Sequence, residues 1–349
     1  MKNMLPTDFI LIGSQAGTHS IYTMEQRFNS FFENKMLSIG MCNATMALIS
    51  VFVSLELKPG DKILTTPYTW GGTISGALFM GLSIVFADID PHTLTLSPAS
   101  VKNQLVKNKD IKVILDVDIF GNPSLSVEIN QIAKEYKCFH LIDSASGFGS
   151  RYKGKPSGFY ADAVVYSFSE SKGINIGEGA VLLVQDSEFF EKLVFYTQHP
   201  NRAKRDAPIY AQNQFALNFR IHPFAAYYLN ENFDISLSKI NQNREDIIDF
   251  LRSLETYSGI RLVNKSFVDY TPSFTRVCFK LSKGPLQVLY HFVNESDKKI
   301  QIEQPSINKL LFNDPVLYEL GYHRQLQYDN SIKVAPEHIL NSYELNFNF

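Results

Sequence analysis

Short apolar runs alternate with helix-patterned stretches through the first half of the chain. Each short run predicts a buried strand, and each longer amphipathic stretch predicts a helix. This alternation is typical of an α/β fold in which helices wrap a mostly parallel sheet. The seven predicted strands are residues 36–40, 62–66, 82–87, 113–117, 138–142, 164–168 and 180–184.

Helices are predicted between these strands, and the pattern changes after Asp186. The predicted helices are 44–57, 72–80, 98–107 and 125–136, followed by longer ones at 187–196, 224–232 and 237–254. Further strands are predicted at 275–281 and 299–303. We therefore expect a three-layer α/β/α domain with a seven-stranded sheet over residues 1–235, and a smaller C-terminal α+β domain over residues 236–349.

Composition narrows the range of partners and sites. Apolar residues make up 45% of the 349 residues and charged residues 19%, which is typical of a globular protein. The net charge of −2 gives no general attraction to nucleic acid or to an anionic membrane, and no apolar run approaches the ~20 residues that span a bilayer. Scattered cysteines and histidines predict neither a disulfide framework nor a metal site, and the N-terminus lacks a signal-peptide pattern. These features favour a cytoplasmic protein.

The segment SFSESKGINIGEG, at residues 167–179, is the most informative part of the sequence. A lysine between two buried strands loses hydration, which disfavours its ammonium form unless the pKa falls or an imine forms. Lys172 therefore favours Schiff-base chemistry, and the glycines at 173, 177 and 179 would let the backbone turn sharply near a flat ligand. A lysine on a solvated loop between two hairpin strands explains this segment about equally well.

Polar residues follow several predicted strands, where ligands bind in open α/β sheets. Thr45 and the amide of Ala44 could hold a phosphate at a helix N-terminus, but Asn43 or Thr45 could simply cap that helix. Trp70 could stack on a flat ring or pack as a partly buried indole. Asp143 could pair with a protonated ring nitrogen or cap the following turn.

Together these turns supply a phosphate site, a stacking platform, an acid for a ring nitrogen and a lysine for an aldehyde, as pyridoxal phosphate requires. The sequence resembles the DegT/StrS-type pyridoxal-phosphate-dependent sugar aminotransferases, which have the aspartate aminotransferase fold, fold type I. The resemblance runs from about residue 17 to residue 232 and is strongest in SFSESKGINIGEGA. Supporting matches, in the family's order, are KPGD at 58–61, YTW at 68–70, DIDP at 88–91, FGNP at 120–123 and ALNFRI at 216–221.

The resemblance implies roles for individual residues. Lys172 would form the Schiff base and move the proton during transamination, and Asp143 would keep the pyridine nitrogen protonated. Trp70 would cover one face of the ring. The implied phosphate contacts are Ala44, Thr45, Ser167 and, from the neighbouring subunit of a homodimer, Asn218.

Several positions depart from the family's pattern. Ser146 stands where the family has a glutamine near the ring hydroxyl, and Asp118 stands where it has a histidine. Glu303 and Gln304 replace a His-Tyr pair of the small domain. Because substrate contacts in the family come largely from such regions, the resemblance leaves the acceptor open.

Three residues after the lysine loop are candidates for substrate binding. His199 lies where relatives often carry a histidine near the site. Arg202 belongs to a basic cluster with Lys204 and Arg205, which could meet a diphosphate or form a solvated face. Arg220 could contact substrate or form a structural ion pair.

The resemblance implies a homodimeric aminotransferase that passes an amino group from an amino acid, expected to be L-glutamate, to a keto sugar, expected to be nucleotide-linked. Such a reaction belongs to the biosynthesis of amino sugars for cell-surface polysaccharides or secondary metabolites. Two alternatives are an enzyme that acts on a cyclitol or other keto substrate, or performs dehydration, and a non-catalytic cofactor-binding regulator. Sugar dehydratases of the family carry histidine in place of the lysine, so Lys172 argues against dehydration.

Overall fold

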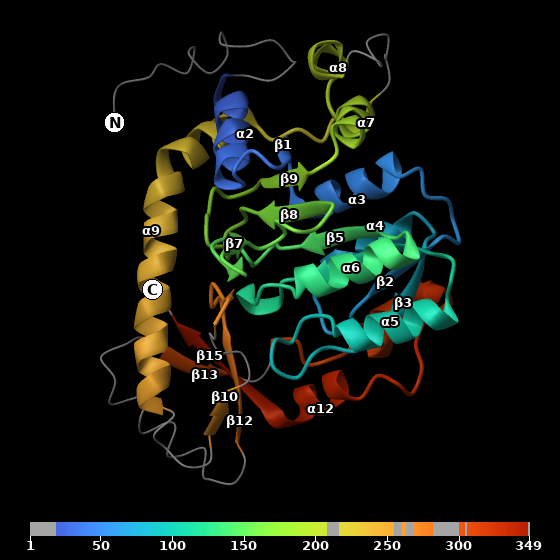
Figure 1. The fold of residues 1–349 in the computed structure, drawn as a ribbon, viewed down its shortest axis with the longest axis vertical. Helices are drawn as coiled ribbons and strands as arrows, with labels where there is room; N and C mark the ends of the chain where they lie inside the picture. Colours follow the sequence, from blue (N-terminus) through green and yellow to red (C-terminus); the bar gives the residue numbers. More distant parts are fainter. Residues whose placement is uncertain are drawn as a thin grey trace.

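The structure is a computed structural model that describes residues 19–207, 216–254, 260–262, 268–281, 300–303 and 306–347. An eight-stranded sheet runs through it in the order β1-β9-β8-β5-β4-β2-β3-β14 (Figure 1). Neighbouring strands are parallel except at β9, which is antiparallel to both β1 and β8. The strands are β1 (Leu37–Met41), β2 (Lys62–Thr65), β3 (Ser83–Phe86), β4 (Ile111–Val117), β5 (Phe139–Asp143), β8 (Ala163–Ser167), β9 (Ala180–Val184) and β14 (Leu326–Gln327). All seven predicted strands are confirmed, with ends that differ by a few residues.

The eighth strand, β14, is not predicted by the sequence pattern and comes from the C-terminal part of the chain. Its two residues pair in parallel with Ile84 and Val85 of β3. A two-residue strand has no apolar run that periodicity could detect. The sheet is therefore one strand wider than the seven strands predicted.

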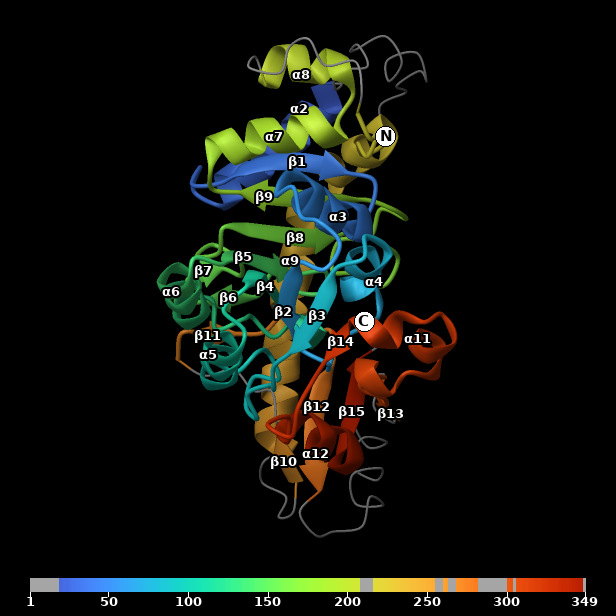
Figure 2. The same cartoon turned by 90° about the vertical axis from the view of Figure 1, so that its right-hand side faces the viewer.

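Helices cover both faces of the large sheet, which gives the three predicted layers (Figure 2). One face packs against α3 (Ala44–Ser54), α4 (Gly72–Phe79) and α7 (Ser187–Thr197). The other face packs against α2 (His19–Phe31), α5 (Pro98–Lys107), α6 (Ser126–Tyr136) and α9 (Pro223–Leu254). Successive side chains of a strand point to opposite faces, so Val113 and Leu115 pack in the first core and Ile114 in the second. Strands buried on both faces read as the continuous apolar runs seen in the sequence.

α9 is one continuous helix of 32 residues, where the sequence pattern predicts two. No proline or glycine follows Pro223 within the helix. Buried apolar side chains recur at every seventh position: Phe233, Ile240, Ile247 and Leu254. The predicted break at residues 233–236 is wrong, because this buried stripe continues through it without a helix-breaking residue. The predicted division at residues 235 and 236 falls inside α9 and stays a prediction.

The C-terminal part forms a second sheet in the order β10-β12-β15-β13 (Figure 1). Its strands are β10 (Ile260–Leu262), β12 (Val277–Leu281), β15 (Ser342–Phe347) and β13 (Ile300–Glu303). β12 and β13 confirm the strands predicted at 275–281 and 299–303. A third, small sheet joins β11 (Tyr270–Thr271) to β6 (Arg151–Tyr152) and β7 (Lys155–Pro156), so the two halves of the chain share backbone pairs.

Asp88, just after β3, ties the C-terminal part to the large sheet a second time. Its carboxylate accepts hydrogen bonds from the backbone N–H groups of Lys333, Val334 and Ala335 at 2.6, 2.7 and 3.0 Å. These residues open α12 (Val334–Asn341), whose N-terminus favours a nearby negative charge. Among the described helices, none is both long enough and apolar enough to cross a membrane.

Candidate active site

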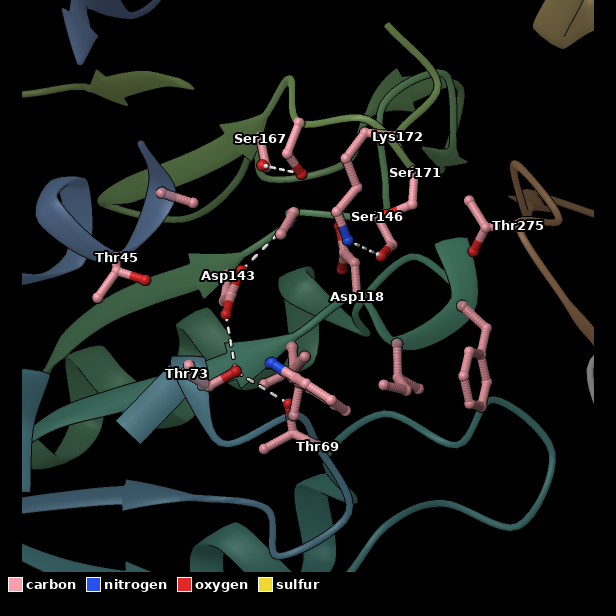
Figure 3. A pocket seen from close by; sticks show the side chains of 18 of the residues that line it. Thr45, Thr69, Thr73, Asp118, Asp143, Ser146, Ser167, Ser171, Lys172 and Thr275 are labelled. Carbon is pink, nitrogen blue, oxygen red and sulfur yellow. Dashed lines mark hydrogen bonds between the residues drawn. The ribbon is translucent and has the colours of Figure 1, made fainter. Parts of the chain in front are cut away.

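The carboxyl ends of β1, β2, β4, β5 and β8 meet at one edge of the large sheet, and the segments that follow them line a cavity of about 920 Å³ (Figure 3). This is the position expected for a ligand in an open α/β sheet. The pocket brings together Ala44, Thr45, Trp70, Asp143, Ser146, Ser167 and Lys172. Thus seven residues predicted to contact the cofactor lie around one cavity, and their individual roles stay predictions.

Lys172 projects into this pocket from the loop after β8 (Figure 3). Its Nζ donates a hydrogen bond to Ser146 Oγ at 3.1 Å. Burial lowers the pKa of the lysine, and the negative charge of Asp143 opposes that shift. The flanking strands are antiparallel, as the solvated-hairpin alternative supposes. The side chain is nevertheless half-buried and faces the cavity, which favours a chemical role.

Gly173 gives the lysine loop a close contact with α9. A Cβ atom at position 173 would lie 2.8 Å from Ile240 Cδ1, closer than real Cβ contacts allow. Ile240 is one of the buried residues of the seven-residue stripe on α9. A larger residue after Lys172 would therefore require the tip of the Ile240 side chain to move.

Asp143 is the last residue of β5 and is buried. Its Oδ2 accepts a hydrogen bond from Thr73 Oγ1 at 2.8 Å, and its Oδ1 accepts one from the Ala145 N–H at 3.1 Å. Burial raises the pKa of this carboxyl, although both hydrogen bonds and the charge of Lys172 oppose the shift. Asp143 thus caps its own turn and also lines the pocket, so its two predicted roles occur together.

Thr73 is a site residue that sequence reasoning missed. It lies in α4, and its hydroxyl is also 2.9 Å from Thr69 Oγ1. The sequence carries no clear signal for this role, because Thr69 precedes the helix and the spacing rule for one helix face does not apply to the pair. Through Thr73, α4 fixes the orientation of the Asp143 carboxyl.

The N-terminus of α3 forms the end of the pocket where phosphate binding was predicted. Asn43 caps the helix by accepting a hydrogen bond from the Met46 N–H at 2.8 Å. Thr45, which lines the pocket, is therefore not the cap. Ser167, which also lines the pocket, donates a hydrogen bond to Ser169 at 3.4 Å. Helix N–H groups and hydroxyls are the donors that a phosphate prefers.

Trp70 lies at the pocket rim with 75% of its surface exposed. The alternative prediction of a partly buried core indole is therefore wrong. An indole this exposed has little packing to support it, and it has a free face to offer a planar ligand.

A second acidic side chain, Asp118, also lines the pocket (Figure 3). Its Oδ1 accepts a hydrogen bond from the Ser124 N–H at 2.8 Å, and its Oδ2 accepts one from the Ser144 hydroxyl. Burial raises the pKa of Asp118 to about 7. Asp116, also buried, is bonded to the Ser124 hydroxyl, and burial raises its pKa to about 6. Burial therefore shifts both carboxyl groups towards their protonated forms.

Residues of the C-terminal part close the other end of the pocket, which we call the distal end: Thr275, Arg276, Ser306 and Ile307. We call the opposite end, around Thr45, Asp143 and Lys172, the cofactor end. In Figure 3, Lys172 and Asp143 lie between Thr45 and Thr275. Sequence reasoning pointed to this part of the chain only through Glu303 and Gln304. It did not identify Arg276, which carries no motif and lies about a hundred positions beyond the lysine.

Asn218, Arg220 and His199 do not line the pocket of this chain. Asn218 is exposed, and its side-chain oxygen accepts a hydrogen bond from Arg220. Their segment lies beside the end of β1, where Cys42 N–H donates to Phe219 O at 2.7 Å. His199 caps α8 (Pro200–Asp206) by accepting from the Asn201 N–H at 3.1 Å. Their predicted contacts with cofactor or substrate stay predictions.

Arg202 is buried in an ion-pair network, with 3% of its surface exposed. Its Nη1 and Nη2 bind the two carboxylate oxygens of Glu25 at 2.8 and 3.0 Å, and its Nε binds Asp206 at 3.1 Å. The solvated face predicted for this residue is wrong, and its guanidinium faces protein carboxylates instead of the pocket. The side chains of Lys204 and Arg205, and Gln304 as a whole, lie outside the described part of the structure.

The fold is that of the fold type I pyridoxal-phosphate enzymes. It superposes with a TM-score of 0.79 on the Escherichia coli GDP-4-keto-6-deoxy-D-mannose-3-dehydratase with bound hydrated pyridoxal phosphate, at 20% identity over 95% of this chain and 88% of that one. The chain belongs to the DegT/DnrJ/EryC1/StrS aminotransferase family, whose model matches residues 13–268. The predicted family and fold class are confirmed.

Two curated relatives are similar over part of the chain. The chain is 32% identical to a UDP-4-amino-4,6-dideoxy-N-acetyl-beta-L-altrosamine transaminase of Campylobacter jejuni, over 60% of this chain and 54% of the relative. It is 29% identical to the GDP-perosamine synthase of Escherichia coli O157:H7, over 49% of this chain and 47% of the relative. The chain thus spans about half the length of the curated relatives that it matches.

The residues around the pocket fit pyridoxal phosphate. The buried Asp143 carboxyl has a raised pKa, so a cationic ring nitrogen would stabilise its ionised form. Lys172 has a lowered pKa, which suits an amine that condenses with an aldehyde. In the described residues, no cluster of three His, Cys, Asp or Glu side chains could hold a metal. With the family established, the prediction of pyridoxal phosphate as the cofactor is confirmed.

Proposed function

We propose that this protein is a pyridoxal-phosphate-dependent aminotransferase that transfers an amino group from an amino acid to a keto sugar. The observation that carries the proposal is that Lys172 and Asp143, which follow different strands, face one pocket (Figure 3). Bound pyridoxal phosphate supplies an electron sink that stabilises negative charge on the substrate carbon. The residues of the chain must then supply a base, a partner for the ring nitrogen and a side chain that covers one face of the ring.

Lys172 is the proton carrier in this proposal. Its lowered pKa increases the neutral fraction that can accept a proton, and Ser146 Oγ holds its Nζ at 3.1 Å. Asp143, fixed by Thr73, would hold a proton on the ring nitrogen. Trp70 would cover the ring and exclude water from one side.

For the substrates, we propose L-glutamate as the donor and a nucleotide-linked keto sugar as the acceptor. The names of the Campylobacter and Escherichia coli relatives support a sugar acceptor. The pocket also carries many hydroxyl groups, which are suited to hydrogen bonds with a polyhydroxylated ligand. They include Ser146, Ser169, Ser171, Thr275 and Ser306.

We further propose that the active form is a homodimer in which Asn218 reaches the phosphate of the neighbouring subunit. Three exposed apolar side chains, Phe224, Tyr228 and Ile235, are spaced four and seven residues apart and so lie on one face of α9. Leu217, next to Asn218, is exposed as well. An apolar face of this kind supports burial against a second copy.

The proposal is tested by adding L-glutamate to protein saturated with pyridoxal phosphate. We expect the visible absorbance of the bound cofactor to change while 2-oxoglutarate is released in a matching amount. Lys172→Ala should show neither change. Lys102→Ala, which removes an exposed lysine paired with Glu135, is the matched control and should behave as wild type.

An unchanged spectrum with L-glutamate, L-glutamine and L-aspartate, in protein that retains its cofactor, would contradict the proposal. That result would favour the cofactor-binding regulator over the enzyme. Release of 2-oxoglutarate without subsequent amination of any keto sugar would instead retain the donor and favour a cyclitol or another keto acceptor.

A further inference from the structure

Two cationic side chains, Lys172 and Arg276, stand among the described residues that line the pocket. Lys172 lies at the cofactor end. Arg276 belongs to the distal end and follows Thr275, which lies on the far side of Lys172 from Thr45 in Figure 3. The roles proposed for the cofactor end leave this second cation unexplained, although every amino-acid donor brings a carboxylate into the pocket.

Arg276 is held by two carboxylates on neighbouring strands. Its Nη1 lies 2.5 Å from Glu303 Oε2, on β13, and 3.5 Å from Glu344 Oε2, on β15. Glu344 is in turn fixed by the N–H and hydroxyl of Ser306, at 3.0 and 3.2 Å from its Oε1. Because Glu303 and Glu344 are paired in the register of the sheet, the guanidinium is positioned by the backbone of the C-terminal part.

The two glutamates differ in how readily a ligand could replace them. The side chain of Glu344 is 1% exposed, whereas that of Glu303 is 33% exposed. Among the described residues, the carboxyl groups of Glu303 and Glu344 share the single guanidinium of Arg276. Burial is the main cause of the raised pKa of Glu344, and the charge of Glu303 adds to it. An incoming anion is therefore best accommodated when it takes the place of Glu303.

We propose that Arg276 binds the carboxylate of the amino-acid donor, in exchange for the carboxylate of Glu303. This inference rests on the proposed aminotransferase function and assigns the donor's binding site within it. A guanidinium pairs with carboxylates through parallel N–H groups. The Glu303 carboxylate, the same chemical group as that of the donor, already accepts a hydrogen bond from Arg276. Glu303 would thus weaken donor binding and make Arg276 a specificity-determining residue.

The test is calorimetric titration of the cofactor-saturated protein with glutarate, a dicarboxylate without an amino group. Because glutarate cannot donate an amino group, its binding can be measured even if the aminotransferase proposal fails. We expect Arg276→Gln to weaken glutarate binding at least tenfold and Glu303→Gln to tighten it severalfold. Arg252→Gln, which removes an exposed guanidinium paired with Asp249, is the matched control and should leave the affinity unchanged.

The kinetic counterpart is a change in the KM for L-glutamate without a change in the KM for the acceptor. Equal glutarate affinity in wild type and Arg276→Gln would overturn the proposal, as would an absence of glutarate binding by wild type. If Arg276→Gln loses the binding of methylenediphosphonate but retains the binding of glutarate, Arg276 is assigned to a diphosphate. That result would also overturn the proposal. If Arg276→Gln does not fold, Glu303→Gln decides alone: an unchanged or weaker glutarate affinity contradicts the exchange.

Discussion

The two ends of the pocket are built in different ways. The cofactor end uses residues that follow strands of the large sheet, including Lys172 after β8 and Asp143 at the end of β5. The distal end uses Arg276 and its neighbours from the C-terminal part, where the sequence departs from the family at Glu303. In the proposed function, residues of the large sheet carry out the reaction and residues of the second sheet select the substrate.

The two ends also differ in how firmly they are held. Beside Asp143, backbone bonds join Asp118 N–H to Asp143 O at 3.0 Å and Ser144 N–H to Val165 O at 2.9 Å. The charge at the distal end depends instead on ion pairs to Glu303 and Glu344. Because partly exposed ion pairs are weaker than buried hydrogen-bonded networks, substitutions at the distal end should adjust affinity, whereas those at the cofactor end should abolish turnover.

The largest effect is expected from Lys172→Ala. Without the amine there is no group to carry the proton, so kcat should fall by about 10⁴-fold or more, while the fold is retained. Steady-state turnover and the thermal midpoint together measure this. A kcat of Lys172→Ala within tenfold of wild type would show that the cofactor end takes no part in the reaction.

Arg202→Gln should cause the next largest effect, on stability and not on substrate affinity. Breaking its buried pair leaves the Glu25 carboxylate without its partner, which costs about 3–5 kcal/mol of unfolding free energy. Denaturant unfolding measures the loss, with the exposed-pair variant Arg252→Gln as control at below about 1 kcal/mol. A raised KM for the acceptor with unchanged stability would place Arg202 at the pocket after all.

Asp143→Asn should lower kcat by roughly 10²-fold to 10³-fold and weaken cofactor binding. The amide retains the shape and the contact with Thr73, but it cannot stabilise a cationic ring nitrogen. Turnover at saturating cofactor and a cofactor titration separate the two effects. Unchanged values for both would show that Asp143 serves only as a cap for its turn.

The smallest effect concerns pH and Asp118. Its pKa is raised to about 7 in the folded protein, so the folded state binds the proton more tightly than the unfolded state. Its contribution to stability is thus full below about pH 4 and is lost as pH rises to about 7. Wild type should lose unfolding free energy between pH 5 and pH 8. In Asp118→Asn this loss should be smaller by roughly 1–2 kcal/mol.

A suitable control for that measurement is Asp110→Asn. The hydrogen bond from Lys62 lowers the pKa of the exposed Asp110, so its contribution is lost on acidification instead. Denaturant unfolding at several pH values compares the two variants. An equal pH slope in wild type and Asp118→Asn would show that this carboxyl does not titrate with folding.

The sequence predicted which residues lie together at the cofactor end, because local pattern carries that information. Apolar runs mark the strands, and the residues after parallel strands meet at one edge, which brought Thr45, Trp70, Asp143 and Lys172 together. Where two roles were open, only the fold could decide: Trp70 is exposed, and Asp143 both caps and faces the pocket.

The remaining features depend on contacts between distant parts of the chain. Arg202 pairs with a glutamate 177 positions away, and Arg276 reaches the pocket through the register of the second sheet. β14 is too short to leave a periodic signal. The continuity of α9 was detectable in principle, from its seven-residue apolar spacing and the lack of Gly or Pro.

The contact between Gly173 and Ile240 has a consequence for how this protein can evolve. A methyl group added at position 173, next to Lys172 in the chain, would lie 2.8 Å from the tip of the isoleucine. Shortening the isoleucine would open room for that methyl group, whereas with Ile240 in place the tip of the isoleucine side chain has to move. A substitution at position 173 should therefore be tolerated better after Ile240 has been shortened.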